Sequence, residues 1–201
     1  MICVIDYGMG NLRSVSKALQ ALGARVRVTN NPKEVEKASK IVLPGVGEFG
    51  HAMDELKKRR LIGPIKEGIE RGKPFLGICL GLQLLLDKSE ESPHVKGLSI
   101  LKGSVKRLET KKRLKIPQMG WNQVDFKRPS PLTRGLRGKP YFYFVHSYYA
   151  DPVDKKEILG TTDYGTSFAS TLERESVFAV QFHPEKSQKN GLQILKNFIN
   201  Y

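Results

Sequence analysis

The sequence predicts an α/β fold: an open, mostly parallel sheet flanked by helices, with an antiparallel extension in its second half. In the first half, short apolar runs alternate with amphipathic segments of helical length, an order typical of parallel sheets covered by helices. From about residue 98, apolar runs follow one another with only turn residues between them, which is typical of antiparallel strands. Because the 201 residues contain no linker or internal repeat, we expect one domain over 1–201.

The elements of the first half follow from the spacing of apolar residues. A helix is expected from Asn11, whose side chain can cap it, to about Leu22, where Gly23 follows. The other expected elements are strands at 2–6, 25–29 and 40–43, helices at 51–58 and 61–71, and a strand leading into Cys79. Ligands bind beyond the carboxyl ends of such strands, so the glycine-rich loops there are expected to cluster on one edge.

The second half reads as six strands and a closing helix. The strands are expected at 104–108, 121–126, 141–149, 157–162, 166–171 and 177–182, and the helix at 187–200. The segment Tyr141 to Tyr149 is unusually aromatic, and its alternation predicts one buried face and one half-exposed face. We expect this segment and the sole tryptophan, Trp121, to serve both core packing and a partner surface or pocket wall.

Bulk properties favour an intracellular globular protein. No apolar stretch approaches membrane-spanning length, and the N-terminus lacks a secretory signal, so no membrane association is expected. Cys3 is expected in a core strand and Cys79 in a turn, which argues against a disulfide framework and predicts a reducing cytoplasm.

The formal charge of +14 admits two interpretations. One is nucleic-acid binding through phosphate contacts. The other is a solvated basic surface with a patch for an acidic partner or a phosphorylated metabolite. The densest basic run, Lys102 to Lys115, holds seven Lys and Arg against one Glu, without interleaved aromatics. Because no nucleic-acid module signature accompanies it, the second interpretation is favoured.

The most informative segment is Gly77-Ile78-Cys79-Leu80-Gly81, which precedes a helix expected over 82–86. This order is that of a nucleophile elbow, in which a strained turn between strand and helix presents the central side chain. The flanking glycines allow strand and helix to approach closely, and a helix N-terminus favours a thiolate. Cys79 is therefore a candidate nucleophile, and a buried structural cysteine is the alternative.

A second segment, Gln181 to Glu185, supplies the partners that a nucleophile needs. Side chains two apart on an extended chain point the same way, and Pro184 favours that extension in His183. His183 is the candidate general base and Glu185 the group that orients it. The alternatives are a core histidine at a strand end and a solvated carboxylate. The remaining histidines have no metal-ligand spacing, so no metal site is expected.

Gly45-Val46-Gly47 ends an expected strand and is expected to face the elbow. The N–H groups of Val46 and Gly47, with that of Leu80, can form an oxyanion hole; a simple turn is the alternative. The glycines of Tyr7-Gly8-Met9-Gly10 do not complete a nucleotide-binding pattern, so dinucleotide binding is not expected.

Together these segments resemble the class I, triad-type glutamine amidotransferases, whose elbow is Gly-x-Cys-x-Gly-x-Gln and whose later motif is His-Pro-Glu. The matching residues are Gly77, Cys79, Gly81, Gln83, His183, Pro184 and Glu185. Within that class, the chain is similar over its length to the glutaminase subunits of imidazole glycerol phosphate synthases. The segments that carry this similarity are 6–12, 43–50, 119–122, 144–148 and 181–187.

The resemblance implies a flavodoxin-like fold, no cofactor and a defined chemistry on L-glutamine. It implies that Cys79 attacks the carboxamide, that His183 protonates the leaving ammonia and then activates water, and that Glu185 holds His183. It implies an oxyanion hole from Val46, Gly47 and Leu80. The implied glutamine contacts are Gly45, Gln83, His146, Ser147 and Tyr148.

The resemblance also implies a (β/α)8-barrel cyclase subunit that receives the ammonia. Our candidates for the interface and the ammonia exit are Asn11, Trp121, Asn122, Tyr143 and Lys186. Three alternatives remain open at this point: a glutaminase of another synthase, a cysteine peptidase or amidase with the same triad, and a non-enzymatic nucleic-acid binder.

Overall fold

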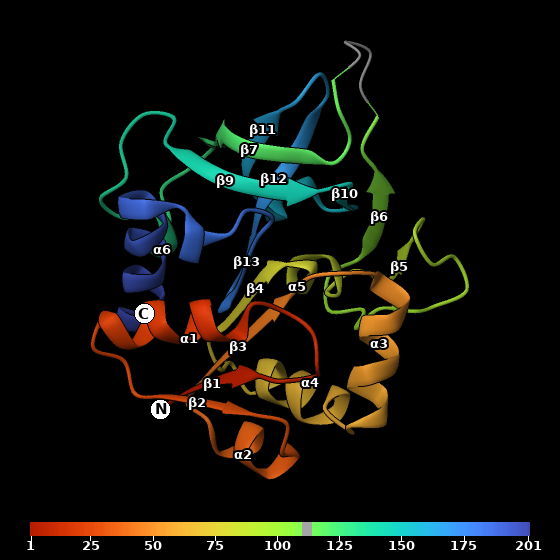
Figure 1. Ribbon diagram of the computed structural model, residues 1–201, viewed down its shortest axis with the longest axis vertical. Helices are drawn as coiled ribbons and strands as arrows, with labels where there is room; N and C mark the ends of the chain where they lie inside the picture. The colour runs from red at the N-terminus through yellow and green to blue at the C-terminus, as the bar shows by residue number, and fades with distance from the viewer. Residues whose placement is uncertain (110–113) are drawn as a thin grey trace.

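The computed structural model describes residues 1–109 and 114–201 and confirms the predicted α/β fold (Figure 1). The large sheet has the order β2-β1-β3-β4-β13-β12-β10-β6-β5, with β11 on β12 and β8 on β11, and β7 and β9 form a separate two-stranded sheet. Residues 110–113, within the basic run, lie outside the described residues. The strands are β1 (Ile2–Ile5), β2 (Val26–Thr29), β3 (Lys40–Gly45), β4 (Phe75–Cys79), β5 (Lys88–Ser89), β6 (Gly103–Arg107), β7 (Gln118–Gln123), β8 (Asp125–Phe126), β9 (Tyr141–His146), β10 (Tyr148–Pro152), β11 (Ile158–Asp163), β12 (Ser167–Arg174) and β13 (Val177–Val180).

The pairing directions divide the large sheet as predicted. β2, β1, β3, β4 and β13 pair in parallel, and the antiparallel part begins at β12 and continues through β10 and β6. β13 comes from the end of the chain but lies beside β4, with Val180 opposite Ile78. This pairing brings the segment that contains His183 next to the segment that contains Cys79.

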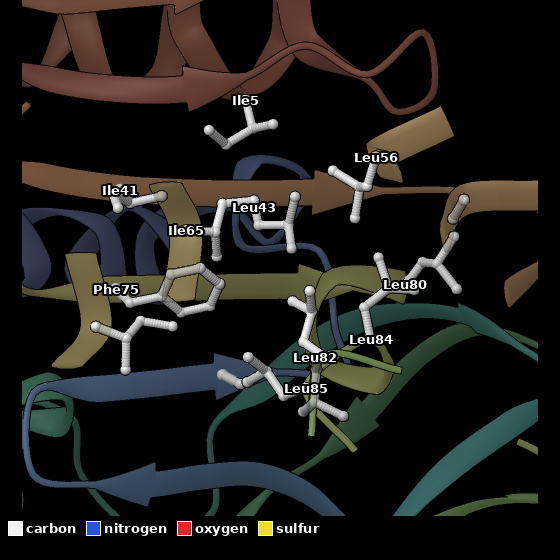
Figure 2. Packing of buried hydrophobic residues seen from close by; sticks show 14 of the residues in the cluster. Ile5, Ile41, Leu43, Leu56, Ile65, Phe75, Leu80, Leu82, Leu84 and Leu85 are labelled. Atoms are coloured by element: carbon white, nitrogen blue, oxygen red, sulfur yellow. The ribbon is translucent and has the colours of Figure 1, made fainter. Parts of the chain in front are cut away.

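Helices cover both faces of the parallel strands. Successive side chains of a strand point to opposite faces and so belong to two separate hydrophobic cores. Ile5 packs with α3 and α4, whereas its neighbour Val4 packs with α1 and α6. Figure 2 shows part of the first core, where Ile65 lies close to Leu43 and Leu56 belongs to the same cluster. No helix in the described ranges is long and apolar enough to cross a bilayer. The helices are α1 (Leu12–Ala21), α2 (Pro32–Lys37), α3 (Phe49–Lys58), α4 (Ile62–Glu70), α5 (Leu80–Gln83) and α6 (Gln188–Asn200), with 3-10 turns at Pro131–Thr133, Lys155–Glu157 and Pro184–Lys186.

The helix expected over 82–86 is wrong, because α5 already ends at Gln83. The backbone carbonyls that would continue it accept hydrogen bonds from a later loop instead. The Leu84 carbonyl accepts the Leu98 N–H at 2.8 Å, and the Leu85 carbonyl accepts the Ile100 N–H at 2.9 Å. The helix dipole expected at Cys79 is correspondingly small, because it is the sum over aligned peptides and α5 has only four residues.

Other elements also differ from the sequence-based expectation. The expected strand at 141–149 is two strands, because the chain leaves the two-stranded sheet at Ser147 and joins the large one. The strand expected to begin at Trp121 begins at Gln118. α2 was not expected, although Asn31 caps it by accepting the Lys33 N–H at 3.0 Å. Asn11 occupies the N-cap position of α1, but its side chain makes no capping hydrogen bond to any residue that the structure describes.

Candidate active site

Cys79 lies at a strained turn between β4 and α5. Its φ of 55° and ψ of −107° are values that a non-glycine residue seldom adopts. A Cβ on Gly81 would stand 1.8 Å from the Leu43 carbonyl oxygen, and a Cβ on Gly77 would stand 2.6 Å from the Gly81 carbonyl oxygen. Only glycine therefore allows α5 to cross so close to β3 and β4. The turn has the geometry of a nucleophile elbow.

The Cys79 thiol is nearly enclosed, with 6% of the residue exposed. Its Sγ lies 3.7 Å from the Val145 carbonyl oxygen and 3.7 Å from Nε2 of Gln181, which donates to it. These contacts come from β9 and from the residue that follows β13, so two distant parts of the chain fix the position of the sulfur.

His183 and Glu185 meet as the sequence predicts, but through a turn. His183 is extended, with φ −96° and ψ 96°, whereas Pro184–Lys186 form a 3-10 turn rather than a continued strand. The His183 Nδ1 lies 2.9 Å from Oε1 of Glu185. The turn is secured by the Ser187 hydroxyl, which donates to the His183 carbonyl at 2.6 Å and accepts the Tyr143 N–H at 2.9 Å.

The surroundings of His183 favour its charged form. Burial alone lowers the pKa of the imidazole, but hydrogen bonds to Cys79 and Glu185, together with the charges of both groups, outweigh it and raise the pKa to about 10. Because Nδ1 is taken by Glu185, Nε2 is the ring nitrogen left for Cys79. A thiolate facing an imidazolium is the arrangement expected of an activated cysteine nucleophile.

A cavity of about 310 Å³ opens beside the thiol. It is formed by the ends of β3, β4 and β9 and by the residues after β13, at the carboxyl edge of the parallel strands. Six of the predicted site residues do not line this cavity: Gly45, Glu185, Asn11, Trp121, Asn122 and Tyr143. Those that do are Val46, Gly47, Cys79, Leu80, Gln83, His146, Ser147, Tyr148, His183 and Lys186.

The expected oxyanion donors lie at the wall of this cavity. Among the residues that the structure describes, neither the Val46 N–H nor the Gly47 N–H has a hydrogen-bond partner. Gly47 has a φ of 98°, and a Cβ there would stand 2.6 Å from the Met9 side chain. Gly45 lies behind the wall, opposite Cys79 in the β3–β4 register. These N–H groups are thus available to stabilise a developing negative charge once they are turned toward the cavity.

Gln83 and His146 fix the far side of the cavity. Nε2 of Gln83 donates to the Tyr148 carbonyl at 2.9 Å and to Oε1 of Gln181 at 3.2 Å, so its own carboxamide oxygen is the atom left for a ligand. His146 Nδ1 lies 2.9 Å from the Tyr148 carbonyl, and its Nε2 lies 2.9 Å from the Gln118 carboxamide. Burial lowers the pKa of His146 to about 4, with the nearby His183 adding to the effect, so His146 is neutral.

Comparison with known proteins agrees with this geometry. The family model described as glutamine amidotransferase class-I matches residues 3–201. The chain belongs to the class-I glutamine amidotransferase family. Imidazole glycerol phosphate synthase subunit HisH of Moorella thermoacetica is 54% identical over 98% of this chain and 93% of its own length. The HisH subunits of Aquifex aeolicus (54% identical, 97% of this chain, 94% of its own) and Pyrococcus furiosus (52%, 98% and 97%) are similar to the same extent.

Solved structures of lower identity share the fold of this amidotransferase. The structure titled PurLQS from Thermotoga maritima aligns with a TM-score of 0.79 at 20% identity, covering 100% of this chain and 97% of its own. A crystal structure of a glutamine amidotransferase aligns with a TM-score of 0.77 at 18% identity, covering 100% of both chains. At these identities the likeness shows the fold alone.

Three lining residues of the cavity were missed by sequence reasoning: Glu91, Pro117 and Val145. Glu91 is the chemically important one, and Oε2 of its carboxylate accepts the Phe49 N–H at 2.8 Å. Burial raises the pKa of Glu91; the Phe49 N–H opposes this, and the charge of Glu48 adds to it. No motif marks Glu91 in the sequence, because the loop that carries it reaches the site only through its contacts with the start of α3.

The predicted interface residues lie outside the cavity, except Lys186. The Trp121 and Tyr143 rings meet edge to face, with centroids 6.0 Å apart, and Lys186 Nζ lies 5.9 Å from the Tyr143 ring centroid. Asn122 donates through Nδ2 to the Asp163 carbonyl at 2.8 Å. Asn11 is placed before α1 and is not part of this aromatic group. Of the five predicted interface residues, Trp121, Tyr143 and Lys186 therefore lie together.

Replacing Cys79 by Ala is expected to lower the pKa of His183 from about 10. The hydrogen bond and the charge of Cys79 are lost, while burial still disfavours the imidazolium. The measurement is an NMR pH titration of the His183 ring in both proteins, with Cys3→Ala as the matched control that leaves this pKa unchanged. Equal values in wild type and Cys79→Ala would contradict the ion pair.

The same pKa fixes the sign of a stability effect. Because the folded-state pKa lies above the ordinary value of 6.5, the contribution of protonated His183 to stability is complete below pH 6.5. It is lost as pH rises through about 10.

Proposed function

We propose that this chain hydrolyses L-glutamine to glutamate and ammonia through a Cys79 thioester. The observation that carries the proposal is the convergence of Cys79, His183 and Glu185, with Cys79 and His183 lining a cavity whose wall includes backbone N–H groups of Val46 and Gly47 that are unpaired within the described ranges. The family supplies the substrate class, and the HisH name of its relatives supplies the setting, a subunit of imidazole glycerol phosphate synthase.

The reaction begins from the ion pair. The Cys79 thiolate adds to the carboxamide carbon, and the C=O electrons move to oxygen, where the N–H groups of Val46, Gly47 and Leu80 stabilise the oxyanion. As the C–N bond breaks, His183 Nε2 gives its proton to the departing ammonia and becomes neutral. It then takes a proton from water, whose oxygen attacks the thioester and releases glutamate and the thiolate. Glu185 keeps the imidazole oriented in both steps.

Recognition of the amino-acid end falls to the opposite wall of the cavity. The Gln83 carboxamide oxygen and the Glu91 carboxylate can both accept hydrogen bonds from an α-ammonium group. Backbone N–H groups of Ser147 and Tyr148 lie on the same wall and suit the α-carboxylate. A bound ammonium group also offsets the burial that raises the pKa of Glu91.

The ammonia passes to a (β/α)8-barrel cyclase subunit, where it serves the synthesis of imidazole glycerol phosphate and aminoimidazole carboxamide ribotide in histidine biosynthesis. An enclosed route suits this task because free ammonia is protonated in water and loses its nucleophilicity. The outer face of the β7–β9 sheet is the proposed docking surface. It exposes Met119 (65%), Trp121 (47%) and Tyr141 (52%), and it continues through Val145 into the cavity.

The chain works as one domain over 1–201 in the cytoplasm. β1 comes from the start of the sequence and β13 from its end, and both belong to the large sheet, which supports a single unit. The free thiols of Cys3 and Cys79 suit a reducing compartment.

Replacing Cys79 by Ala is expected to abolish glutamine-dependent synthesis by the complex, by at least about a thousandfold, because the nucleophile is lost. Synthesis from added ammonium salt is retained, since the cyclase is untouched. Cys3→Ala, which changes the other cysteine in a buried strand, keeps both activities. Persistence of both activities in Cys79→Ala would refute the nucleophile assignment, and loss of both would refute the division of labour.

Replacing Glu91 by Gln is expected to raise the KM for glutamine about 10- to 100-fold with little change in kcat, because one charge-assisted hydrogen bond to the ammonium group is weakened. The measurement is steady-state glutaminase kinetics. Glu90→Gln is the matched control, since the neighbouring Glu90 carboxylate accepts the Arg107 N–H instead. A fall in kcat without a change in KM would exclude this role.

Trp121 reports on the proposed docking surface because it is the only tryptophan of the chain. Its fluorescence is expected to shift to shorter wavelength on titration with a tryptophan-free cyclase, since the half-exposed ring becomes buried. Trp121→Ala should weaken the complex about 30-fold, as measured by calorimetry. Val153→Ala, at an exposed apolar residue outside this sheet, is the control. An unshifted spectrum on complex formation would place the interface elsewhere.

A further inference from the structure

The Tyr7 side chain is completely buried, yet its hydroxyl has no hydrogen-bond partner among the residues that the structure describes. Buried hydroxyl groups are nearly always paired, since an unpaired one loses its hydrogen bonds to water without replacement. Burial and the nearby charge of Cys79 both raise the pKa of Tyr7, so the group is a protonated phenol and can donate. The hydroxyl is therefore a donor beside the site that is available to an acceptor brought within its reach.

The hydroxyl lies directly behind the expected oxyanion loop. Tyr7 follows β1, which pairs with β3, and its hydroxyl oxygen is 2.3 Å from where a Cβ on Gly45 would stand. Cβ of Leu80 lies on the same side of Gly45, 2.9 Å from that position. Tyr7 does not line the cavity, and it follows β1, which flanks β3 on the edge opposite to β4 and Cys79.

The geometry of a peptide bond links this hydroxyl to the oxyanion hole. In a trans peptide, the N–H and C=O groups point in opposite directions. When the Val46 N–H points into the cavity to bind an oxyanion, the Gly45 carbonyl of the same peptide must point away from the cavity. The side away from the cavity is where the Tyr7 hydroxyl lies. Glycine at position 45 lets the phenol lie this close to the peptide, because a Cβ there would overlap the hydroxyl oxygen.

We propose that Tyr7 is a positioning residue for the oxyanion hole: its hydroxyl donates to the Gly45 carbonyl when the Gly45–Val46 peptide turns its N–H toward the substrate. The hydroxyl is unpaired in the present structure, so the peptide is here in its other orientation. The unpaired phenol destabilises that resting orientation, and the new hydrogen bond stabilises the catalytic one. This inference rests on the proposed glutaminase function.

Replacing Tyr7 by Phe tests the proposal, because it removes the hydroxyl and keeps the ring. The kcat for glutamine hydrolysis is expected to fall about tenfold in the full chain, alone and with the cyclase, with KM unchanged. The melting temperature is expected to equal or exceed that of wild type, since an unpaired buried hydroxyl is lost. Tyr201→Phe is the control: its half-exposed ring packs on Phe178 and does not line the cavity.

Alkylation of Cys79 by iodoacetamide separates the oxyanion hole from the thiol. The thiolate displaces iodide in this reaction and no oxyanion forms, so the rate should be the same in wild type and Tyr7→Phe. An unchanged kcat, a lowered melting temperature, or an equal loss of alkylation and hydrolysis would each overturn the proposal. Wild type and Cys79→Ala are run in the same assay. Failure of wild type to hydrolyse glutamine refutes the proposed function, whereas a fully active Tyr7→Phe refutes only the role of Tyr7.

Discussion

The close crossing of α5 over β3 and β4 is the constraint on which the rest of the site depends. A Cβ on Gly81 would overlap the Leu43 carbonyl oxygen at 1.8 Å, so no other residue fits there. The short distance forces the chain to turn within one residue, and Cys79 takes the left-handed conformation that this turn requires. The position of the sulfur relative to the β3 loop is therefore set by backbone contact, which leaves little freedom for the proposed nucleophile to move.

Two histidines line the same cavity and are held in opposite charge states. His183 is surrounded by groups that stabilise its imidazolium, the Cys79 sulfur and the Glu185 carboxylate. Within the described ranges, His146 has no carboxylate partner. It faces a carbonyl and a carboxamide, and burial keeps it neutral. Burial acts against the charged form in both, and only the partner groups differ. One positive charge is thereby confined to the ring that would transfer the proton.

The loop that follows β3 has different contacts on its two sides: hydrogen bonds on one and van der Waals contact on the other. On the outer side, the Ser92 hydroxyl donates to Oε1 of Glu48 at 2.5 Å and accepts the Gly50 N–H at 3.0 Å. These two hydrogen bonds connect the segment after β3 to the loop that carries Glu91. On the inner side, the Tyr7 phenol touches Gly45 without a hydrogen bond. The proposed turn of the Gly45–Val46 peptide takes place between these two contacts.

The sequence by itself determined the α/β class, the strand that ends at Cys79 and the segments that carry His183 and Glu185, because these depend on local patterns of apolar residues, glycine and proline. It failed where long-range contacts overrule local preference: residues 84–86 look helical, but their carbonyls bond to residues 98–101. Glu91 carries no local signal, because its place in the cavity depends on the Phe49 N–H at the start of α3. The unpaired Tyr7 hydroxyl is likewise invisible in the sequence. The motifs predicted that Cys79, His183 and Glu185 act together, but only the tertiary structure shows what brings them together. It places β13 beside β4, and no local pattern specifies which strands pair.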